Sequence, residues 1–572
     1  MKSLRWIVSI ASVFLLIIGC LLWWNRPRPV DMALYAPADS VAYLESNSLL
    51  QVARSISSTD AWLSLRPFIA AKGYSWNHPW LQSFCSWTGI GPTRMVILTR
   101  AQVAIAVIEV GTTAEAETVK IKPEAAILVE THTAQWRVKP ALELLLKKFA
   151  ADTYGQPIFQ RTQIDGAEFI EWLSPKGDRR IVAVLNGTLV IIGNTEHAVR
   201  SCLGVRLGQR PSLRETQELQ QMRQALHSDA SLAFGYISSK SAARLLSLGA
   251  PLLFGQPPGN PQFEHLLASG AAKILGSVGW SACPALGGIE DHYLFSLQAP
   301  IVSRLKPVFK ATATSAEVLK VLPTNFESLT IYKYQDPAAV WNTFEMAISS
   351  QLDTLSAVIF DSMVKSALLP YGIEKPEEFL HKVGPELLTM RIDQETEHSL
   401  LIAAADKKTT LQQVATKELG GNQREERIGE IVVAEAPEKS RAVTLINGYL
   451  LTGSSADVRR CAQVWSENRT GIREEKFKPI FHFVPLSSMA NILSYTNDVA
   501  RVRTFLYALG RAQGVTDPSN LKDGSEQALA ALPYAASQTI LADQGLERTT
   551  RSCFGQFSVL LSLLFPAPEA RP

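Results

Sequence analysis

The sequence predicts an α+β protein in which an N-terminal transmembrane helix precedes two homologous α+β repeats, each with a largely antiparallel sheet and packed helices. Two observations predict this plan. An uncharged apolar stretch of 19 residues occupies residues 6–24. In addition, one passage occurs twice in the same order, near Asn186 and near Asn447: an alternating strand, an Asn-Gly turn, a second strand and a helix. A repeat of that length indicates duplication of a whole domain.

The apolar stretch at residues 6–24 has the length and the flanks of a signal anchor. About 20 apolar residues cross a bilayer core, and the tryptophans at both ends of the stretch suit the two membrane interfaces. Lys2 and Arg5 precede it, so residues 1–5 are expected to stay in the cytoplasm. The bulk of the chain is then periplasmic, held by one pass through the inner (cytoplasmic) membrane.

Two other uses of the N-terminus compete with the anchor. A cleaved signal peptide would need a small-x-small site after the apolar run, and none follows it. Ile17-Ile18-Gly19-Cys20 resembles a lipoprotein cleavage box, which would leave a lipidated Cys20 at the mature N-terminus. Because the apolar run continues through Trp24, the uncleaved anchor is the preferred prediction and the lipoprotein is the alternative.

The repeat divides the rest of the chain. After a Pro-rich linker at residues 25–34, the first α+β repeat is predicted at residues 35–302 and the second at residues 318–565. A joint rich in Lys, Ser and Thr separates them at residues 303–317, and residues 566–572 form a Pro-rich tail that is expected to be disordered.

Within the repeats, a short strand followed by a helix is predicted four times. The predicted strands are at residues 40–44, 231–236, 328–332 and 479–483, and the helices begin at Ser48, Ser239, Asp336 and Ser487. Apolar strands at 125–129 and 399–403 are each expected to precede a helix, near 139–142 and 410–414. Hairpins are expected to turn at Asp165-Gly166 and near Gly429. The apolar segment 554–565 is too short to cross a membrane and is predicted to be the closing strand.

Composition narrows the class of protein. Of 572 residues, 47% are hydrophobic and 19% are charged, which is typical of a folded globular chain and argues against extensive disorder. A net charge of +3 over this length provides no concentrated basic face. Nucleic-acid binding is therefore not expected, because phosphate contacts need clustered Lys and Arg.

The six cysteines do not suggest a disulfide scaffold, because they are few and widely spaced. Cys202 and Cys461 occupy matching positions on apolar helix faces and are predicted to be buried. One bridge, involving Cys283, is left open.

No motif identifies a reaction. Glu290-Asp291-His292 offers metal ligands, but successive strand residues point to opposite faces, so a turn entering the last strand is preferred. The segment 517–524 lacks the spacing of a calcium loop and is expected to be a polar surface loop. Gly89-Ile90-Gly91 lacks a third glycine, and no phosphate loop, HExxH or GxSxG is present. The sequence predicts no catalytic residue, no cofactor and no metal site.

One aromatic cluster interrupts the duplication and is the candidate ligand or partner surface. Its residues are Trp62, Tyr74, Trp76, His78, Trp80 and Trp87. Such a cluster could bind a sugar, a lipid or a partner, but a satellite core beneath a loop is the preferred interpretation.

The opening Pro-Ala-Asp-Ser-Val-Ala-Tyr-Leu at residues 37–44, the single anchor and the repeated Asn-Gly hairpin followed by a helix resemble the bacterial domain-of-unknown-function 3352 family. The resemblance covers nearly all of the chain after Tyr35. It implies an internally duplicated, signal-anchored envelope protein and provides no catalytic residues.

The leading functional hypothesis is a non-catalytic interaction or scaffold module of the cell envelope, with an envelope protein as its partner. The first alternative is a protein that binds a lipid or another apolar ligand, which requires an apolar cavity of more than about 300 Å³. The second alternative is a hydrolase with an active site in one repeat only, which requires a nucleophile within hydrogen-bond reach of a base.

Overall fold

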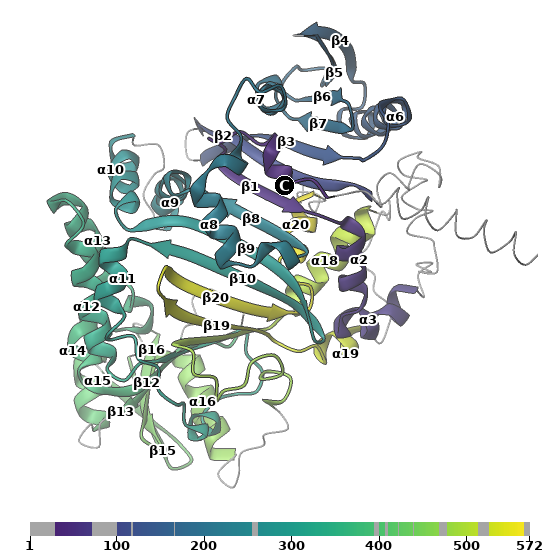
Figure 1. Cartoon of the computed structure of the whole chain (residues 1–572). Coiled ribbons are helices and arrows are strands. Elements are labelled where there is room, and N and C mark those ends of the chain that lie inside the picture. Colours follow the sequence, from purple (N-terminus) through teal and green to yellow (C-terminus); the bar gives the residue numbers. More distant parts are fainter. Residues whose placement is uncertain are drawn as a thin grey trace, which may run out of the picture.

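The computed structural model describes residues 29–70, 100–115, 118–164, 166–253, 261–393, 400–405, 410–420, 423–436, 438, 440–467, 477–512 and 525–564. Its centre is one sheet of 20 strands (Figure 1). The strands of the first half are β1 (Ala42–Ser46), β2 (Gln102–Glu115), β3 (Thr118–Glu130), β4 (Ile158–Ile164), β5 (Ala167–Leu173), β6 (Arg180–Asn186), β7 (Leu189–Gly193), β8 (Ala233–Ile237), β9 (Leu275–Ala285) and β10 (Gly288–Leu297). Those of the second half are β11 (Ser328–Lys333), β12 (Val383–Arg391), β13 (Leu400–Ala405), β14 (Arg424–Ile428), β15 (Ile431–Ala436), β16 (Arg441–Ile446), β17 (Tyr449–Ser454), β18 (Ile492–Thr496), β19 (Ala535–Ala542) and β20 (Gly545–Ser552).

Helices cover the sheet. In the first half they are η1 (Met32–Tyr35), α2 (Leu49–Ser57), α3 (Asp60–Ala70), α6 (Gln135–Tyr154), α7 (Glu196–Arg206), η2 (Leu213–Glu215), α8 (Gln217–Ala225), η3 (Ser228–Ala230), α9 (Ser239–Leu253), α10 (Pro261–Ala272) and α11 (Ala299–Leu305). In the second half they are η4 (Ala316–Lys320), α12 (Pro337–Ser349), α13 (Thr354–Ser366), η5 (Leu369–Tyr371), α14 (Pro376–Leu380), α15 (Leu411–Leu419), α16 (Ser455–Glu467), α18 (Val499–Ala512), α19 (Ser525–Ala530) and α20 (Phe557–Leu564).

The order of strands across the sheet reads the same from both ends. From one edge to the middle it is β4-β5-β6-β7-β3-β2-β1-β8-β9-β10. From the middle to the other edge it is β20-β19-β18-β11-β12-β13-β17-β16-β15-β14. Every neighbouring pair is antiparallel, and β10 pairs with β20 in the middle. The predicted α+β class with antiparallel strands is confirmed, but the separate sheets expected for the two repeats are one continuous sheet, because β10 pairs with β20.

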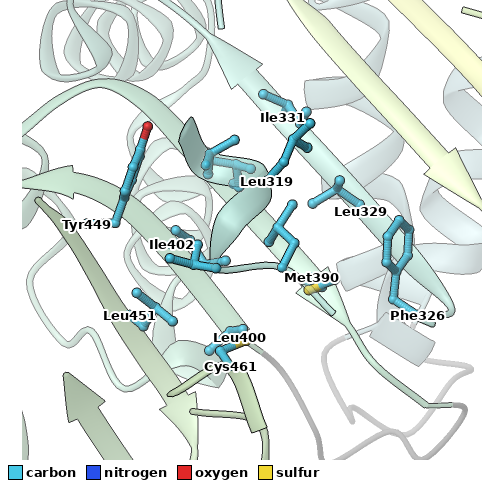
Figure 2. Close-up of a cluster of buried hydrophobic side chains, with 14 of the residues drawn as sticks. Leu319, Phe326, Leu329, Ile331, Met390, Leu400, Ile402, Tyr449, Leu451 and Cys461 are labelled. Atoms are coloured by element: carbon cyan, nitrogen blue, oxygen red, sulfur yellow. The ribbon is translucent and has the colours of Figure 1, made fainter. Parts of the chain in front are cut away.

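The sheet is apolar on both faces because helices pack on both. In the first half, Val182 and Val184 of β6 face α7, whereas Ile181 and Ala183 face α6. The second half repeats this arrangement with α16 on one face and α14 and α15 on the other. Figure 2 shows the α16 side, where side chains of β11, β12, β13 and β17 meet Cys461.

The duplicated cysteines lie in equivalent cores. Cys202 on α7 and Cys461 on α16 are fully buried, as predicted, and burial raises the pKa of both thiols. Within the described residues all four cysteines, including Cys283, are free, so no bridge involves them.

Local capping signals predicted several helix starts correctly. The Ser48 side chain accepts a hydrogen bond from the Gln51 N–H at the start of α2, and Asp336 accepts one from the Ala339 N–H at the start of α12. The hairpin near Gly429 and the strand–helix pairs at β3–α6 and β13–α15 are also as predicted.

Two predicted strands are wrong. Residues 479–483 form turns, and the strand of that unit is β18, about ten residues later. The segment 554–565 is largely the helix α20, whose apolar side chains pack on one side against β8, β9 and β10 and on the other against helices of the α3–α18 cluster. The counterpart of β10 is β20.

The two Asn-Gly hairpins also differ. In the second half Asn447 and Gly448 form the two-residue loop, both with positive φ. In the first half Asn186 still pairs with Leu189, so the loop is Gly187-Thr188. The same dipeptide therefore sits one position earlier relative to the loop, which corrects the predicted turn.

Several contacts join the two halves beside the β10–β20 pair, and two of them involve α3 and α10. Helix α3 of the first half packs on α18 and α19 of the second half. Conversely, α10 of the first half approaches α13: a Cβ added at Gly270 would lie 3.2 Å from Leu352 Cδ2, just before α13. Each half thus completes its packing with helices of the other.

Candidate functional site

A large cleft opens where the two halves meet. Its volume is about 1160 Å³, and its walls come from α3, from the turns between α16 and β18, and from α19 with the residues after it. The lining residues are Asp60, Ala61, Ser64, Leu319, Phe477, Lys478, Pro479, Phe481, His482, Pro485, Leu486, Ser487, Ala528, Ala531, Leu532 and Pro533. This set is mainly apolar, with a few polar groups, as is typical of ligand sites.

On this side of the cleft, residues 478–491 of the connection from α16 to β18 form no regular helix. In the first half the connection from α7 to β8 contains the regular helix α8, whose Leu219 and Met222 are buried. The same place in the second half contains Pro479 and Pro485. Proline lacks an N–H and clashes with the preceding helical turn, so residues 479–487 form turns instead.

Aromatic packing holds these turns in place. Phe477 stacks on Phe481 with ring centres 5.8 Å apart, and the Phe481 ring meets the buried Tyr495 at 5.0 Å. Phe477 is buried in the core on the α16 side. The wall of the cleft is therefore a fixed part of that core.

Helix α3 forms the opposite wall and carries the first residue of the predicted aromatic surface. Trp62 is only 3% exposed, and its ring meets the edge of Phe554 at 6.5 Å. Trp62 is thus a core residue, in agreement with the preferred interpretation. Its neighbours Ala61 and Ser64 line the cleft. The other five residues of that surface, Tyr74, Trp76, His78, Trp80 and Trp87, lie outside the described residues.

Two polar residues of the cleft, Asp60 and His482, lie at the tip of the β9–β10 hairpin. The Asp60 N–H donates to the Gly287 carbonyl at 3.0 Å. A Cβ added at Gly287, whose φ is +76°, would lie 2.4 Å from Asp60 Oδ2 and 3.7 Å from His482 Nε2. Glycine is therefore required here for both its conformation and its size.

These polar groups are not arranged for nucleophilic catalysis. The Ser64 hydroxyl donates to the Ala61 carbonyl of its own helix at 3.0 Å. His482 makes a ring contact with Phe483, with centroids 4.9 Å apart. In the part of the chain that the structure describes, no hydrogen bond joins Ser64, His482 and Asp60. The hydrolase hypothesis receives no support from this cleft.

Near the cleft, the Asp498 carboxyl and the Cys553 thiol are buried in the core. Asp498 accepts a hydrogen bond from the Cys553 N–H at 2.9 Å, and both residues are buried. Burial raises the pKa of the Asp498 carboxyl, and burial together with the Asp498 charge raises the pKa of the Cys553 thiol. A thiol in that state is not a nucleophile.

The predicted turn at Glu290-Asp291-His292 is instead the middle of β10. Glu290 and His292 lie on one face, with Glu290 Oε1 2.9 Å from His292 Nε2, and Glu290 also pairs with Arg551 of β20. These contacts, from His292 first, lower the pKa of Glu290 to about 2. Asp291 lies on the opposite face, so the three do not form one metal site, as the strand argument required.

The segment 517–524 lies outside the described residues, as does the predicted anchor at residues 6–24. Among the helices that the structure does describe, none has both the length and the apolar character needed to cross a bilayer. No family model matches the chain, and no curated protein or solved structure matches it either.

Proposed function

We propose that this protein is a single-pass, membrane-anchored binding protein of the bacterial envelope, whose cleft between two duplicated halves holds an apolar or amphipathic ligand. The observation that carries the proposal is the cleft of about 1160 Å³ with its mainly apolar wall. It exceeds the roughly 300 Å³ expected of a small-molecule site. It is lined in part by residues of the connection between α16 and β18, whose counterpart in the first half includes α8.

Duplication of a domain is the origin proposed for the two halves. The mirrored strand order and the equivalent burial of Cys202 and Cys461 support it. Membership of the domain-of-unknown-function 3352 family, with residues 35–302 and 318–565 as homologous repeats, is part of the same proposal.

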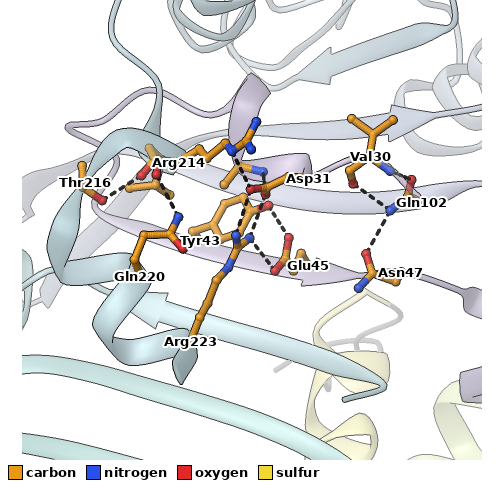
Figure 3. Close-up of polar contacts among 12 residues, drawn as sticks. Val30, Asp31, Tyr43, Glu45, Asn47, Gln102, Arg214, Thr216, Gln220 and Arg223 are labelled. Atoms are coloured by element: carbon orange, nitrogen blue, oxygen red, sulfur yellow. Dashed lines mark hydrogen bonds and ion pairs between the residues drawn. The ribbon is translucent and has the colours of Figure 1, made fainter. Parts of the chain in front are cut away.

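Val30 and Asp31, near the start of the described chain, are hydrogen-bonded to β2 and to α8. This firm attachment supports the proposed anchor at residues 6–24. Asp31 accepts two hydrogen bonds of 3.0 Å from the Arg223 guanidinium, which also pairs with Glu45 at 2.7 Å (Figure 3). Gln102 binds both the N–H and the carbonyl of Val30, at 2.7 and 2.9 Å. The described end of the linker, residues 29–34, is therefore fastened to the sheet. A periplasmic location at the inner membrane is part of the proposal.

A fluorescent fatty acid tests ligand binding, with full-length protein in a mild detergent whose micelles are counted as a competing phase. Ala531 lines the cleft, and its neighbour Ala530 is exposed but does not. Ala531→Trp places an indole ring in the cleft and is expected to weaken saturable binding at least tenfold, whereas Ala530→Trp leaves it unchanged. Equal binding by the two variants, or no saturable binding by the natural protein, would refute the proposal.

A protein partner is the second candidate, and Leu286 favours it. This residue is 97% exposed at the tip of the hairpin that contacts Asp60 at the cleft. A photo-crosslinking amino acid at position 286, activated in intact cells, is expected to trap one envelope protein. The same group at exposed Leu207 serves as the control. Identical products from both positions would contradict the scaffold hypothesis.

A further inference from the structure

Three potential metal ligands from separate elements come together on the first half. Glu109 is on β2, Glu124 is on β3, and His197 is in the first turn of α7. One donor atom from each lies within 4.8 Å of the others. Glu109 and Glu124 are 15 positions apart in the sequence, and Glu124 and His197 are 73 apart, so no short motif predicts this cluster.

The arrangement is held by the backbone around it. A register shift between Val107 and Glu109 brings Glu109 directly opposite Glu124 in the β2–β3 pair. On the other side, the Asn194 side chain accepts from the Ala125 N–H at 2.9 Å and donates to the Pro123 carbonyl at 2.6 Å. These two bonds fix the start of α7 against the strand that carries Glu124.

The two carboxylates oppose each other without a cationic side chain between them. Like charges directly opposite on antiparallel strands destabilise the pair. Among the described residues, neither Glu109 nor Glu124 forms an ion pair with Lys or Arg. Glu124 Oε2 is 2.8 Å from His197 Nδ1 and accepts a hydrogen bond from the Thr195 hydroxyl at 3.2 Å. A bound cation would remove this repulsion.

We propose that Glu109, Glu124 and His197 form a binding site for a divalent transition-metal ion such as Zn²⁺. An imidazole nitrogen with two carboxylates suits Zn²⁺ or Mn²⁺, whereas Ca²⁺ and Mg²⁺ prefer oxygen ligands alone. Ligands at about 2.0–2.2 Å from a tetrahedral ion are roughly 3.3 Å apart, so rotation of the exposed Glu109 side chain closes the site. Three protein ligands leave a fourth position for water.

Zinc binding by the full-length protein, after treatment with a chelator and buffer exchange, tests this site. In competition with a chromophoric chelator, one equivalent of Zn²⁺ is expected to bind. His197→Ala and Glu109→Gln are each expected to weaken binding at least tenfold. Both side chains are exposed, so neither change disturbs the core. Equal circular dichroism spectra and melting temperatures of the metal-free proteins check this.

His381→Ala is the matched control, because His381 is exposed and outside the trio. It should bind Zn²⁺ as the natural protein does. Millimolar Ca²⁺ or Mg²⁺ should not displace the ion. The proposal would be overturned if the natural protein bound no Zn²⁺ tightly, or if the His197→Ala and His381→Ala proteins bound Zn²⁺ with equal affinity. The site is independent of the cleft, so its failure leaves the fatty-acid experiment unaffected.

Discussion

Asp291 is expected to make the stability of the protein dependent on pH, through the contacts of β10 with β9 and with the start of α20. Its carboxyl is only 1% exposed and accepts hydrogen bonds from Trp280 Nε1 at 2.9 Å and from the Gln556 N–H at 3.1 Å, just before α20. Burial raises its pKa from 3.8 to about 6, because two donors do not fully replace water around the charge. The folded protein thus holds this proton more tightly than the unfolded chain does.

The sign and the size of the effect follow from that difference. A raised pKa contributes stability that is fully present below about pH 4 and is lost as the pH rises through about 6. The difference between the two pKa values, 3.8 and about 6, corresponds to about 3 kcal/mol of stability, at roughly 1.4 kcal/mol per pH unit. Asn at position 291 cannot titrate, so Asp291→Asn removes this part of the pH dependence. The substitution also places the Asn amide NH₂ against the N–H of either Trp280 or Gln556, which then loses its acceptor. This loss lowers stability at all pH values.

The assay is urea unfolding of both detergent-solubilised proteins at pH 4 and pH 7, followed by tryptophan fluorescence. Between these pH values the natural protein should lose about 3 kcal/mol more of its free energy of unfolding than the variant does. The difference between the two proteins cancels the contributions of all other titrating groups. Identical pH dependence in both proteins would show that Asp291 is not the titrating group and would refute the reasoning.

Three further predictions concern packing and buried charge, each measured by urea unfolding. Trp62→Ala should cost about 3–5 kcal/mol, because it empties the core behind the cleft; a cost below 1 kcal/mol would mean that Trp62 is not packed. Gly279→Ala should cost about 1–3 kcal/mol, since its Cβ would lie 2.2 Å from Met222 Sδ, and Met222→Ala should restore part of the loss. Arg223→Met should cost about 3–5 kcal/mol by leaving Glu45, whose pKa burial already raises, unpaired; adding Glu45→Gln should recover much of this loss.

The sequence was most informative where structure depends on near neighbours. The start of α2 at Ser48 and of α12 at Asp336 follows from a side chain that binds an amide within the next turn. The Asn-Gly dipeptide predicted both hairpins, but a one-residue difference in strand pairing decides which residues form the loop.

Errors arose where short apolar segments fit both a helix and a strand. Residues 479–483 alternate like a strand, yet their packing against Tyr495 selects turns. Segment 554–565 is mainly apolar, and its packing against both the sheet and neighbouring helices, which no local pattern reveals, accompanies its helical form. The cleft and the Glu109–Glu124–His197 trio depend on contacts across the fold, which no local pattern reveals. Of the predicted aromatic surface, only Trp62 is described, and it is core.

The central strand pair, β10 with β20, joins the two halves of the sheet within one covalent chain. His292 faces Thr549 there, with His292 Nδ1 3.4 Å from Thr549 Oγ1, and the pairing runs outward from that point in both directions. A half expressed alone would end in an open strand edge and would lack the helices that the other half provides. Fusion keeps the two edges permanently together at any protein concentration. It also lets the two sides of that pair differ in sequence, because a change on β10 is not repeated on β20.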